Sequence, residues 1–271
     1  MLEYVYFDFK PFGVEQKVSS LAQFLGFLEG FAECHGFDSP HVISTICKDM
    51  AAGLQYLHEN GVAHRDFKPA NILISNQHYC DLAIDDIEEA WERRPLVCKV
   101  ADFGKSRSSE IQTNSILQSK TNRVNRGTPV YMAPEMLVEE MRLPVASAED
   151  LKRADIWSFG MTLFVLLNRS SRYPFYGEIQ EALKEGKAPI RTLENLFKNR
   201  KVPIEPSKHQ NKHATDWFFV HKIWAKCIQF DPTARPTIED VVKMINQDSA
   251  ADPAASALNI HLKVNQRNFE L

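Results

Sequence analysis

The sequence predicts a mainly α-helical fold, a helical bundle around one buried central helix with a few short β-strands. Residues 41–60 carry apolar side chains at intervals of three and four, the pattern of a helix with one buried face. Residues 156–167 are apolar nearly all round, which is typical of a helix enclosed by others. Apolar runs at 72–74 and 97–101 favour small strands. Helices should therefore form most of the core.

The N-terminal elements follow from composition and capping. Residues 1–9 are rich in aromatic side chains and predict a short strand. Ser19 or Ser20 can cap a helix that ends near Glu29. The apolar stripe of this helix consists of Leu21, Phe24, Leu25 and Leu28. The 41–60 helix has a longer stripe, made of Ile43, Ile46, Met50, Leu54 and Leu57. Both helices should pack against the core.

The C-terminal half predicts a polar loop and further helices. Residues 105–128 are rich in Ser, Thr, Asn and Arg and predict a mobile surface loop. After the buried helix, an aromatic-rich helix is expected over 217–230. Thr237 and Asp240 have the spacing of a capping box that starts a last helix. The residues from 248 onward predict a flexible tail.

Composition and charge exclude several classes of protein. Of the 271 residues, 44% are hydrophobic and 25% are charged, as in ordinary globular proteins. The net charge is −3, so a nucleic acid is not expected as the main partner. No apolar run reaches the ~18 residues that a membrane-spanning helix needs. Five scattered cysteines fit reduced thiols. We therefore expect a cytoplasmic protein that binds no membrane, with a nuclear location also open.

Three short motifs stand in a definite order. Residues 64–71 read His-Arg-Asp-Phe-Lys-Pro-Ala-Asn and lie between a predicted helix and a predicted strand. Asp102-Phe103-Gly104 follows the second strand, and Ala133-Pro134-Glu135 comes after the polar loop. Each motif alone occurs by chance. Their order and spacing resemble the catalytic loop, the metal-binding motif and the end of the activation segment in the eukaryotic protein kinase family.

The resemblance continues in three further motifs, at 127–129, 155–160 and 231–235. It implies an α+β, kinase-like C-lobe over 1–247, with the hinge at residues 1–5 and the flexible tail over 248–271. The small N-lobe of a kinase carries a Gly-x-Gly-x-x-Gly loop, but no two of the eleven glycines stand two residues apart. We therefore expect the N-lobe to be absent from this sequence.

The resemblance implies the residues of phosphoryl transfer from ATP to a protein. Asp66 would accept or orient the substrate hydroxyl, and Lys68 would place a positive charge beside the phosphoryl group. Asn71 and Asp102 match the family's metal ligands and offer the oxygen atoms that Mg²⁺ prefers. The position of Lys68 relative to Asp66, together with Thr128, resembles Ser/Thr kinases and not tyrosine kinases.

The nucleotide would lie between the hinge and the first short strand of the pair. Leu73 matches the floor beneath the adenine, although a plain core leucine fits the same pattern. Glu3 and Val5 match the hinge side of the same site, so the resemblance makes all three residues candidates for cofactor binding.

Regulatory and structural roles also follow from the resemblance. Arg65 matches an arginine that in many kinases pairs with a phosphate on the activation loop. Candidate regulatory residues in that loop are Ser115, Ser119, Thr121 and Thr128, although Ser and Thr are common in any exposed loop. Glu135 and Arg235 match a buried ion pair, and Asp155 a structural aspartate on the buried helix.

An insert is expected at about 75–97, because the interval between Asn71 and Asp102 is about twice the one usual in the family. The insert is strongly acidic, with Asp81, Asp85, Asp86, Glu88, Glu89 and Glu92. Its apolar residues Ile84, Ile87 and Trp91 stand three and four apart, which predicts a short amphipathic surface helix. A passive insertion is the simpler interpretation, and docking of a basic partner is the alternative.

Two functions are consistent with these residues. The first is a truncated protein Ser/Thr kinase domain that uses ATP and Mg²⁺, acts on Ser or Thr of protein substrates and obtains a small lobe or regulator from another chain. The second is a catalytically inactive C-lobe module that competes for kinase partners. Intact Asp66, Asn71 and Asp102 favour the first function. The isolated chain is expected to be inactive, because the adenine would have a floor and no roof.

Overall fold

The computed structural model describes residues 5–30, 40–108, 129–141, 146–168, 171–204 and 218–250. Most of the predicted loop at 105–128 and most of the predicted tail fall outside these ranges. The candidate residues Glu3, Ser115, Ser119, Thr121 and Thr128 also lie outside the described residues.

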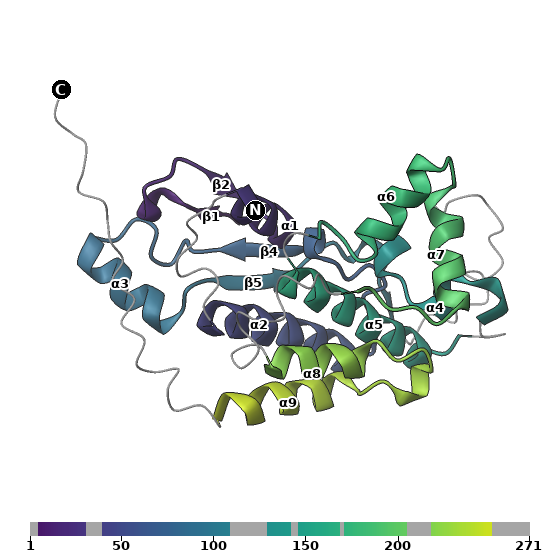
Figure 1. The fold of residues 1–271 in the computed structure, drawn as a ribbon. Helices are drawn as coiled ribbons and strands as arrows, with labels where there is room; N and C mark the ends of the chain where they lie inside the picture. The colour runs from purple at the N-terminus through teal and green to yellow at the C-terminus, as the bar shows by residue number, and fades with distance from the viewer. Residues whose placement is uncertain are drawn as a thin grey trace.

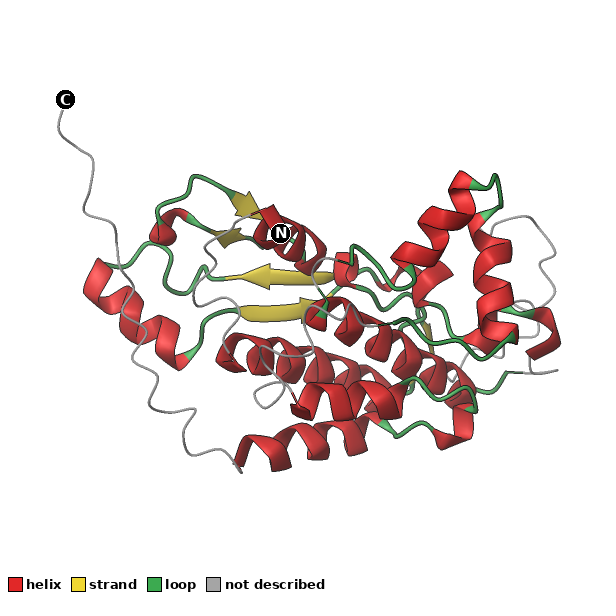
Figure 2. Ribbon diagram, viewed as in Figure 1, coloured by secondary structure: helices red, strands yellow, loops and turns green. Residues whose placement is uncertain are grey.

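Helices make up most of the described chain, and the two longest strands run side by side among them (Figures 1 and 2). The helices are α1 (Leu21–Gly30), α2 (Pro40–Glu59), α3 (Ile84–Arg93), α4 (Pro134–Leu137), α5 (Ala148–Leu167), α6 (Tyr176–Lys184), α7 (Pro189–Lys198), α8 (Phe218–Cys227) and α9 (Ile238–Ala250). The strands are β1 (Phe7–Asp8), β2 (Lys17–Val18), β3 (Val62–Ala63), β4 (Ile72–Ser75), β5 (Val97–Val100) and β6 (Arg107–Ser108). The predicted mainly α-helical fold is confirmed.

The strands pair in three antiparallel couples, β1 with β2, β3 with β6 and β4 with β5. The couple β4–β5 consists of the two apolar runs that the sequence predicted as strands. Its register places Ile72 opposite Val100 and Ser75 opposite Val97. The catalytic-loop motif therefore leads into one strand of this couple, and the Asp-Phe-Gly motif follows the other.

The central helix of the core is α5. Every residue from Ala154 to Leu167 is buried, as the apolar composition predicted. Helix α8 packs closely on α5, and α2 packs between β5 and α9 (Figure 1). The close approach of α8 depends on Gly160, since a Cβ atom there would lie 2.9 Å from the Cβ of Cys227. Larger residues at this position would push α8 away from the core.

The predicted helical stripes are buried except at Leu57 of α2, which is partly buried. Leu21, Phe24, Leu25 and Leu28 of α1 are at most 4% exposed, and Ile43, Ile46, Met50 and Leu54 of α2 are at most 1% exposed. Ser20 accepts the first capping hydrogen bond of α1 from the amide of Gln23 at 3.3 Å. The chain leaves α2 through Gly61, whose φ of +70° favours glycine. Sequence periodicity therefore located the buried faces correctly.

Several element boundaries differ from the predictions. Helix α8 covers most of the range predicted at 217–230, and α9 continues to Ala250, which lies in the predicted tail. Helices α6 and α7 were not predicted. In α7 a proline at the first turn and buried Leu193 and Phe197, four residues apart, are signals that could have identified it.

The insert contains the predicted acidic helix, α3. One face of it is joined to the core more deeply than a passive surface insertion requires. Trp91 is 2% exposed, and its ring lies 5.1 Å from that of Phe12. Beyond the helix, Arg94 pairs with Asp49 at 2.9 Å. The acidic side chains remain on the exposed face.

Candidate active site

The catalytic-loop motif folds around Asp66. The ammonium group of Lys68 lies 3.0 Å from Asp66 Oδ2. The side-chain amide of Asn71 donates to the main-chain oxygen of Asp66 at 2.8 Å and to Oδ2 at 3.3 Å. The Asp66 side chain is only 10% exposed, so these contacts act in a partly dehydrated environment where charge interactions are stronger than in water. Three of the predicted residues therefore form one cluster.

Asp102 is brought to the same cluster by the backbone. The amide of Ala101 donates to the main-chain oxygen of Asn71 at 2.9 Å. Asp102 itself has a left-handed conformation with φ of +62°, and its Oδ1 accepts from the amide of Gly104 at 3.3 Å. This backbone conformation is uncommon for a residue with a Cβ atom, and Asp102 is exposed. The predicted pair of metal ligands thus lies on adjoining segments.

His64 links the two segments through its ring. Its Nδ1 accepts a hydrogen bond from the amide of Asp66 at 3.2 Å. The proton must then be on Nε2, which donates to the main-chain oxygen of Ala101 at 3.0 Å. The ring is fully buried. His64 therefore fixes the distance between the backbone that carries Asp66 and the backbone that precedes Asp102.

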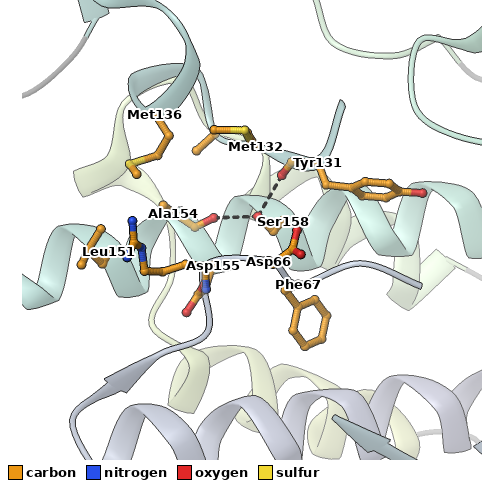
Figure 3. Close-up of a pocket in the computed structure, with 11 residues that line it drawn as sticks. Asp66, Phe67, Tyr131, Met132, Met136, Leu151, Ala154, Asp155 and Ser158 are labelled. Carbon is orange, nitrogen blue, oxygen red and sulfur yellow. Dashed lines mark hydrogen bonds between the residues drawn. The ribbon is translucent and has the colours of Figure 1, made fainter. Parts of the chain in front are cut away.

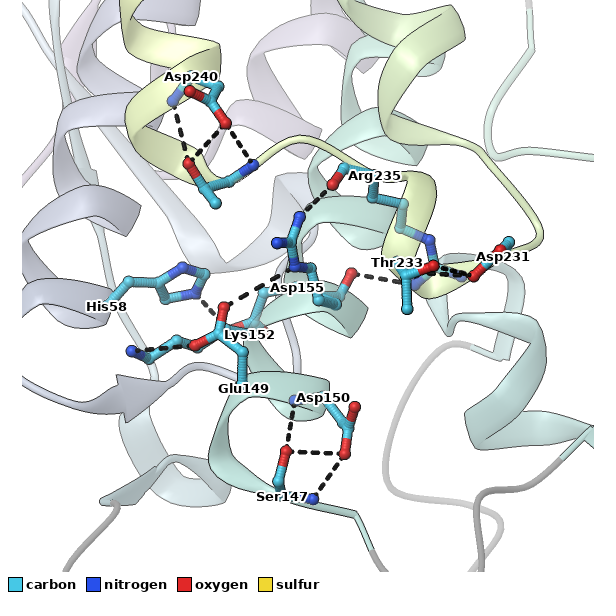
Figure 4. A network of polar contacts seen from close by, with 12 residues as sticks. His58, Ser147, Glu149, Asp150, Lys152, Asp155, Asp231, Thr233, Arg235 and Asp240 are labelled. Carbon is cyan, nitrogen blue, oxygen red and sulfur yellow. Dashed lines mark hydrogen bonds and ion pairs between the residues drawn. The ribbon is translucent and has the colours of Figure 1, made fainter.

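Asp155 of α5 holds the start of the catalytic loop. Its carboxylate accepts hydrogen bonds from the backbone amides of His64 and Arg65, each at 2.7 Å. Arg65 has a φ of +66°, which is costly for a residue with a Cβ atom and needs such support. His58, from the last turn of α2, lies 2.9 Å from the same carboxylate (Figure 4). His58 was not singled out in the sequence, because a single histidine at the end of a helix carries no pattern.

A pocket opens beside Asp66, between the catalytic loop and α5 (Figure 3). Tyr131 and Met132 form its far wall, and Ser158 fixes that wall by donating to the main-chain oxygen of Tyr131 at 2.8 Å. A second cavity, of about 420 Å³, lies next to Lys68 and is lined by Leu25, Tyr131, Val165 and Tyr173, among others. Both cavities border the cluster around Asp66.

Glu135 and Arg235 form the predicted ion pair. Two hydrogen bonds, of 2.6 and 2.8 Å, join the guanidinium to the carboxylate. Arg235 is 2% exposed and Glu135 is 6% exposed. Two further hydrogen bonds run from Arg235 Nε to the main-chain oxygen of Gln229 and from Arg235 Nη1 to that of Arg153. The pair therefore joins α4, α5 and the segment before α9.

The predicted adenine contacts occupy neighbouring segments. Val5, which is buried, stands two residues before β1. Leu73 is half-buried in the middle of β4 and forms a β-bridge to Ser20.

Tyr131, which lines both cavities, is buried, and burial raises the pKa of its hydroxyl far above its usual value. It therefore stays neutral at physiological pH.

Within the described ranges, no three His, Cys, Asp or Glu side chains come together as a complete metal site. Asn71 and Asp102 are a two-residue oxygen set. Such a set fits Mg²⁺, which keeps several waters and uses one or two carboxylates together with phosphate oxygens from a substrate.

Comparison with known proteins assigns the family. The protein kinase domain matches residues 20–245, which is most of the chain, and the chain belongs to this family. Its motifs, its mainly helical fold and its cluster around Asp66 agree with that assignment. None of the helices in the described ranges is long and apolar enough to cross a membrane.

Curated relatives match at low identity. The chain is 27% identical over 217 residues to the eukaryotic translation initiation factor 2-alpha kinase gcn-2 of Caenorhabditis elegans, and this match covers 78% of the chain and 12% of the relative. It is 30% identical to the probable serine/threonine-protein kinase gdt2 of Dictyostelium discoideum, covering 73% of the chain and 9% of that protein. It is also 30% identical to the serine/threonine-protein kinase ELM1 of Saccharomyces cerevisiae, covering 76% and 27% respectively. The chain thus spans about a quarter or less of these relatives.

Proposed function

We propose that the chain is the C-lobe of a protein Ser/Thr kinase, which transfers the γ-phosphoryl group of ATP to a Ser or Thr hydroxyl of a protein. The observation that carries the proposal is the cluster in which Lys68 and Asn71 both contact the Asp66 carboxylate. The Ser/Thr relatives and the kinase-domain match support it.

Asp66 is the residue that receives the substrate hydroxyl. Its carboxylate borders the pocket beside Tyr131, so a hydroxyl entering there meets an oxygen that can accept its hydrogen bond. Lys68 lies 3.0 Å from that carboxylate and keeps a positive charge next to the transferred group. Charge on the transferred phosphoryl is thereby stabilised by a cation already in position.

Asn71 and Asp102 are the proposed holders of Mg²⁺. The amide nitrogen of Asn71 is used by Asp66, which leaves the amide oxygen as the metal ligand. Asp102 contributes its exposed carboxylate. When bound, Mg²⁺ neutralises negative charge on the phosphates.

The adenine is proposed to lie on Leu73, with the hinge residues Glu3 and Val5 at its edge. These residues supply one side of the site only. We propose that a small lobe, from the same protein or from another chain, supplies the glycine-rich loop and the lysine that cover the phosphates.

The acceptor hydroxyl is proposed to enter the pocket at Asp66, and the rest of the substrate to lie along the cavity beside Lys68. Its lining by Leu25, Val165 and Tyr173 is suited to an extended peptide with an apolar side chain near the acceptor. The phosphorylated residue would be Ser or Thr. Arg65, at the rim of the neighbouring pocket, is the proposed partner of a regulatory phosphate on Ser115, Ser119, Thr121 or Thr128.

Replacing Asp66 by Asn tests this proposal. With the small lobe present, Asp66→Asn should reduce radiolabel transfer to a generic basic protein by at least about a hundredfold, because it removes charge and keeps shape. Asp81→Asn, in the exposed part of the insert, is the matched control and should be neutral. Hydrolysis of the labelled product should yield phosphoserine or phosphothreonine. Near wild-type transfer by the Asp66→Asn protein would refute the assignment.

Assays with and without the small lobe separate the two candidate functions. A kinase lobe should gain transfer activity when the small lobe is added and lose it again in the Asp66→Asn protein. Binding of an intact kinase's partners with no transfer under any condition would instead support the competing interaction module.

A further inference from the structure

The insert begins with residues that bind the backbone near the hinge. The side-chain amide of Asn76 donates to the main-chain oxygen of Asp8 at 2.8 Å, and its Oδ1 accepts from the amide of Asp8 at 2.7 Å. Gln77 Oε1 accepts from the amide of Tyr6 at 3.3 Å. These side-chain bonds join residues 6–8 to residues 76–77 much as backbone bonds join two strands of a sheet, although β4 ends at Ser75.

Asn76 alone makes both of the hydrogen bonds to the backbone of Asp8 described above. It is fully buried, and one planar amide satisfies both backbone groups of Asp8. Without it, a buried N–H and a buried C=O would lose their partners, which is more costly than losing an exposed hydrogen bond. The Asp8 carboxylate is engaged separately, with Lys17 at 3.0 Å and the amide of Lys10 at 2.9 Å.

Strands β1 and β2 form a hairpin, and the chain after β2 is attached to β4, which carries Leu73, the proposed adenine floor. Strand β1 pairs with β2, and the chain after β2 then meets β4, where the amide of Ile74 donates to the main-chain oxygen of Ser19 at 3.1 Å. Ser20 forms the β-bridge to Leu73. Asn76 thus completes a closed set of contacts among β1, β2 and β4, and Leu73 belongs to this set.

Helix α3 of the insert also contacts the β1–β2 hairpin. Trp91 packs edge-on against Phe12, which lies between β1 and β2, with 5.1 Å between ring centroids. Phe12 in turn stacks on Phe7 of β1, with 6.1 Å between centroids. The aromatic contacts and the Asn76 amide therefore hold the same hairpin from two sides.

We propose that Asn76 is a positioning residue for nucleotide recognition, which fixes the segment after the hinge relative to Leu73. This inference rests on the proposed kinase function, since it assumes that the adenine lies between Val5 and Leu73. It gives the insert a role in the active site in place of a passive one.

Asn76→Ala tests the inference in the protein with its small lobe present. Hydrogen exchange at Asp8 should accelerate by about tenfold, because the buried side-chain amide that accepts from its N–H is gone. The Kd for Mg-ATP should rise by about tenfold, whereas the Kd for Mg-tripolyphosphate, which has no adenine, should stay within about twofold. Exchange at residues 64–71 should not change. Asn199→Ala, at the exposed end of α7, is the control and should alter none of these values.

Equal weakening of ATP and tripolyphosphate binding, or unchanged exchange at Asp8, would overturn the inference. If Asn76→Ala does not fold, Gln77→Ala removes the contacts of Gln77 Oε1 with the amide of Tyr6 and the hydroxyl of Ser75 and leaves the Asn76–Asp8 bonds in place. It should accelerate exchange at Tyr6 and raise the Kd for Mg-ATP by a smaller factor. A wild-type protein that binds no Mg-ATP would refute the proposed function and the nucleotide role of Asn76 together. The exchange rates would still report whether Asn76 holds the hairpin.

Discussion

Two segments of the active site are each anchored by one buried carboxylate, and the anchors differ in what they bind. Asp155 holds the catalytic loop by its backbone, through the amides of His64 and Arg65 at 2.7 Å. Glu135 holds α4 to the chain before α9 through the guanidinium of Arg235, which is 100 residues away in sequence. One anchor fixes the dihedral angles of a loop, whereas the other joins distant segments.

The chemistry of the two anchors assigns them different consequences. A buried ion pair is strongly destabilising when one partner is removed, because the other charge stays buried without compensation. A carboxylate that accepts backbone amides mainly selects a conformation, here one with a positive φ at Arg65. We therefore expect loss of the Glu135–Arg235 pair to reduce stability and loss of the Asp155 charge to reduce the reaction rate.

The largest effect is expected from Arg235→Met. It leaves the Glu135 carboxylate buried alone, so the free energy of unfolding in urea should fall by about 3–5 kcal/mol. The double variant Arg235→Met with Glu135→Leu should recover part of this loss, because no charge remains to be buried. The rate per folded molecule should change by less than about threefold. A loss below about 1 kcal/mol would show that the pair is not the anchor described here.

Asp155→Asn should affect the rate. An amide presents one oxygen and one NH₂ group, so it cannot accept from His64, Arg65 and His58 together as the carboxylate does. Phosphoryl transfer should fall by about a hundredfold, equivalent to about 2.7 kcal/mol in the barrier. The KM for ATP should stay within about threefold. A rate that falls only in proportion to the folded fraction in urea would remove the distinction between the two anchors.

The two anchors were predicted from the sequence to different extents. The Glu135–Arg235 pair was expected as a pair, and it is present. For Asp155 a structural role was expected, but its partner His58 was not. His58 stands four residues after Leu54 and lies on the same buried face, but helical periodicity does not say which distant residue it contacts. A contact between the end of one helix and the middle of another has no local signature.

The same limit applies to the insert. Its acidic composition and its apolar spacing predicted α3 correctly, because both are local properties. Its packing on Phe12 and the bonds from Asn76 to Asp8 were missed, since they join segments about 70 to 80 residues apart in sequence. The roles of Asp66, Lys68, Asn71 and Asp102 remain predictions, and the Asp66→Asn protein tests the first of them.

Stability at alkaline pH reports on the Glu135–Arg235 anchor, because the buried thiol of Cys227 interacts with the charge of Arg235. Burial raises the pKa of Cys227 to about 12, although the charge of Arg235 opposes this rise, and burial also raises the pKa of Cys47 in α2 to about 12. In the unfolded chain these thiols ionise near pH 9, so stability is intact below pH 9 and is lost as the pH rises from 9 toward 12.

Each thiol should contribute a slope of about 1.4 kcal/mol per pH unit in that window. Urea unfolding between pH 8 and pH 10.5 measures the slope, and Cys227→Ala should reduce it by one such contribution. In the Arg235→Met protein the pKa of Cys227 should rise further, which extends the window at its upper end. An unchanged slope in the Cys227→Ala protein would mean that this thiol is not protected by burial.

The smallest effect is expected at the start of the helix that carries Asp155. Ser147 caps α5, with the amide of Asp150 donating to its Oγ at 3.1 Å, and Asp150 Oδ2 accepts from the amide of Ser147 at 2.8 Å. Ser147→Ala should lower the free energy of unfolding by about 1 kcal/mol. It should leave the transfer rate per folded molecule unchanged, because the cap lies two helical turns before Asp155 and contacts none of the catalytic loop. If initial rates fell as far in the Ser147→Ala protein as in the Asp155→Asn protein, the effect of Asp155 would be one of helix stability, and the loop would have no anchor of its own.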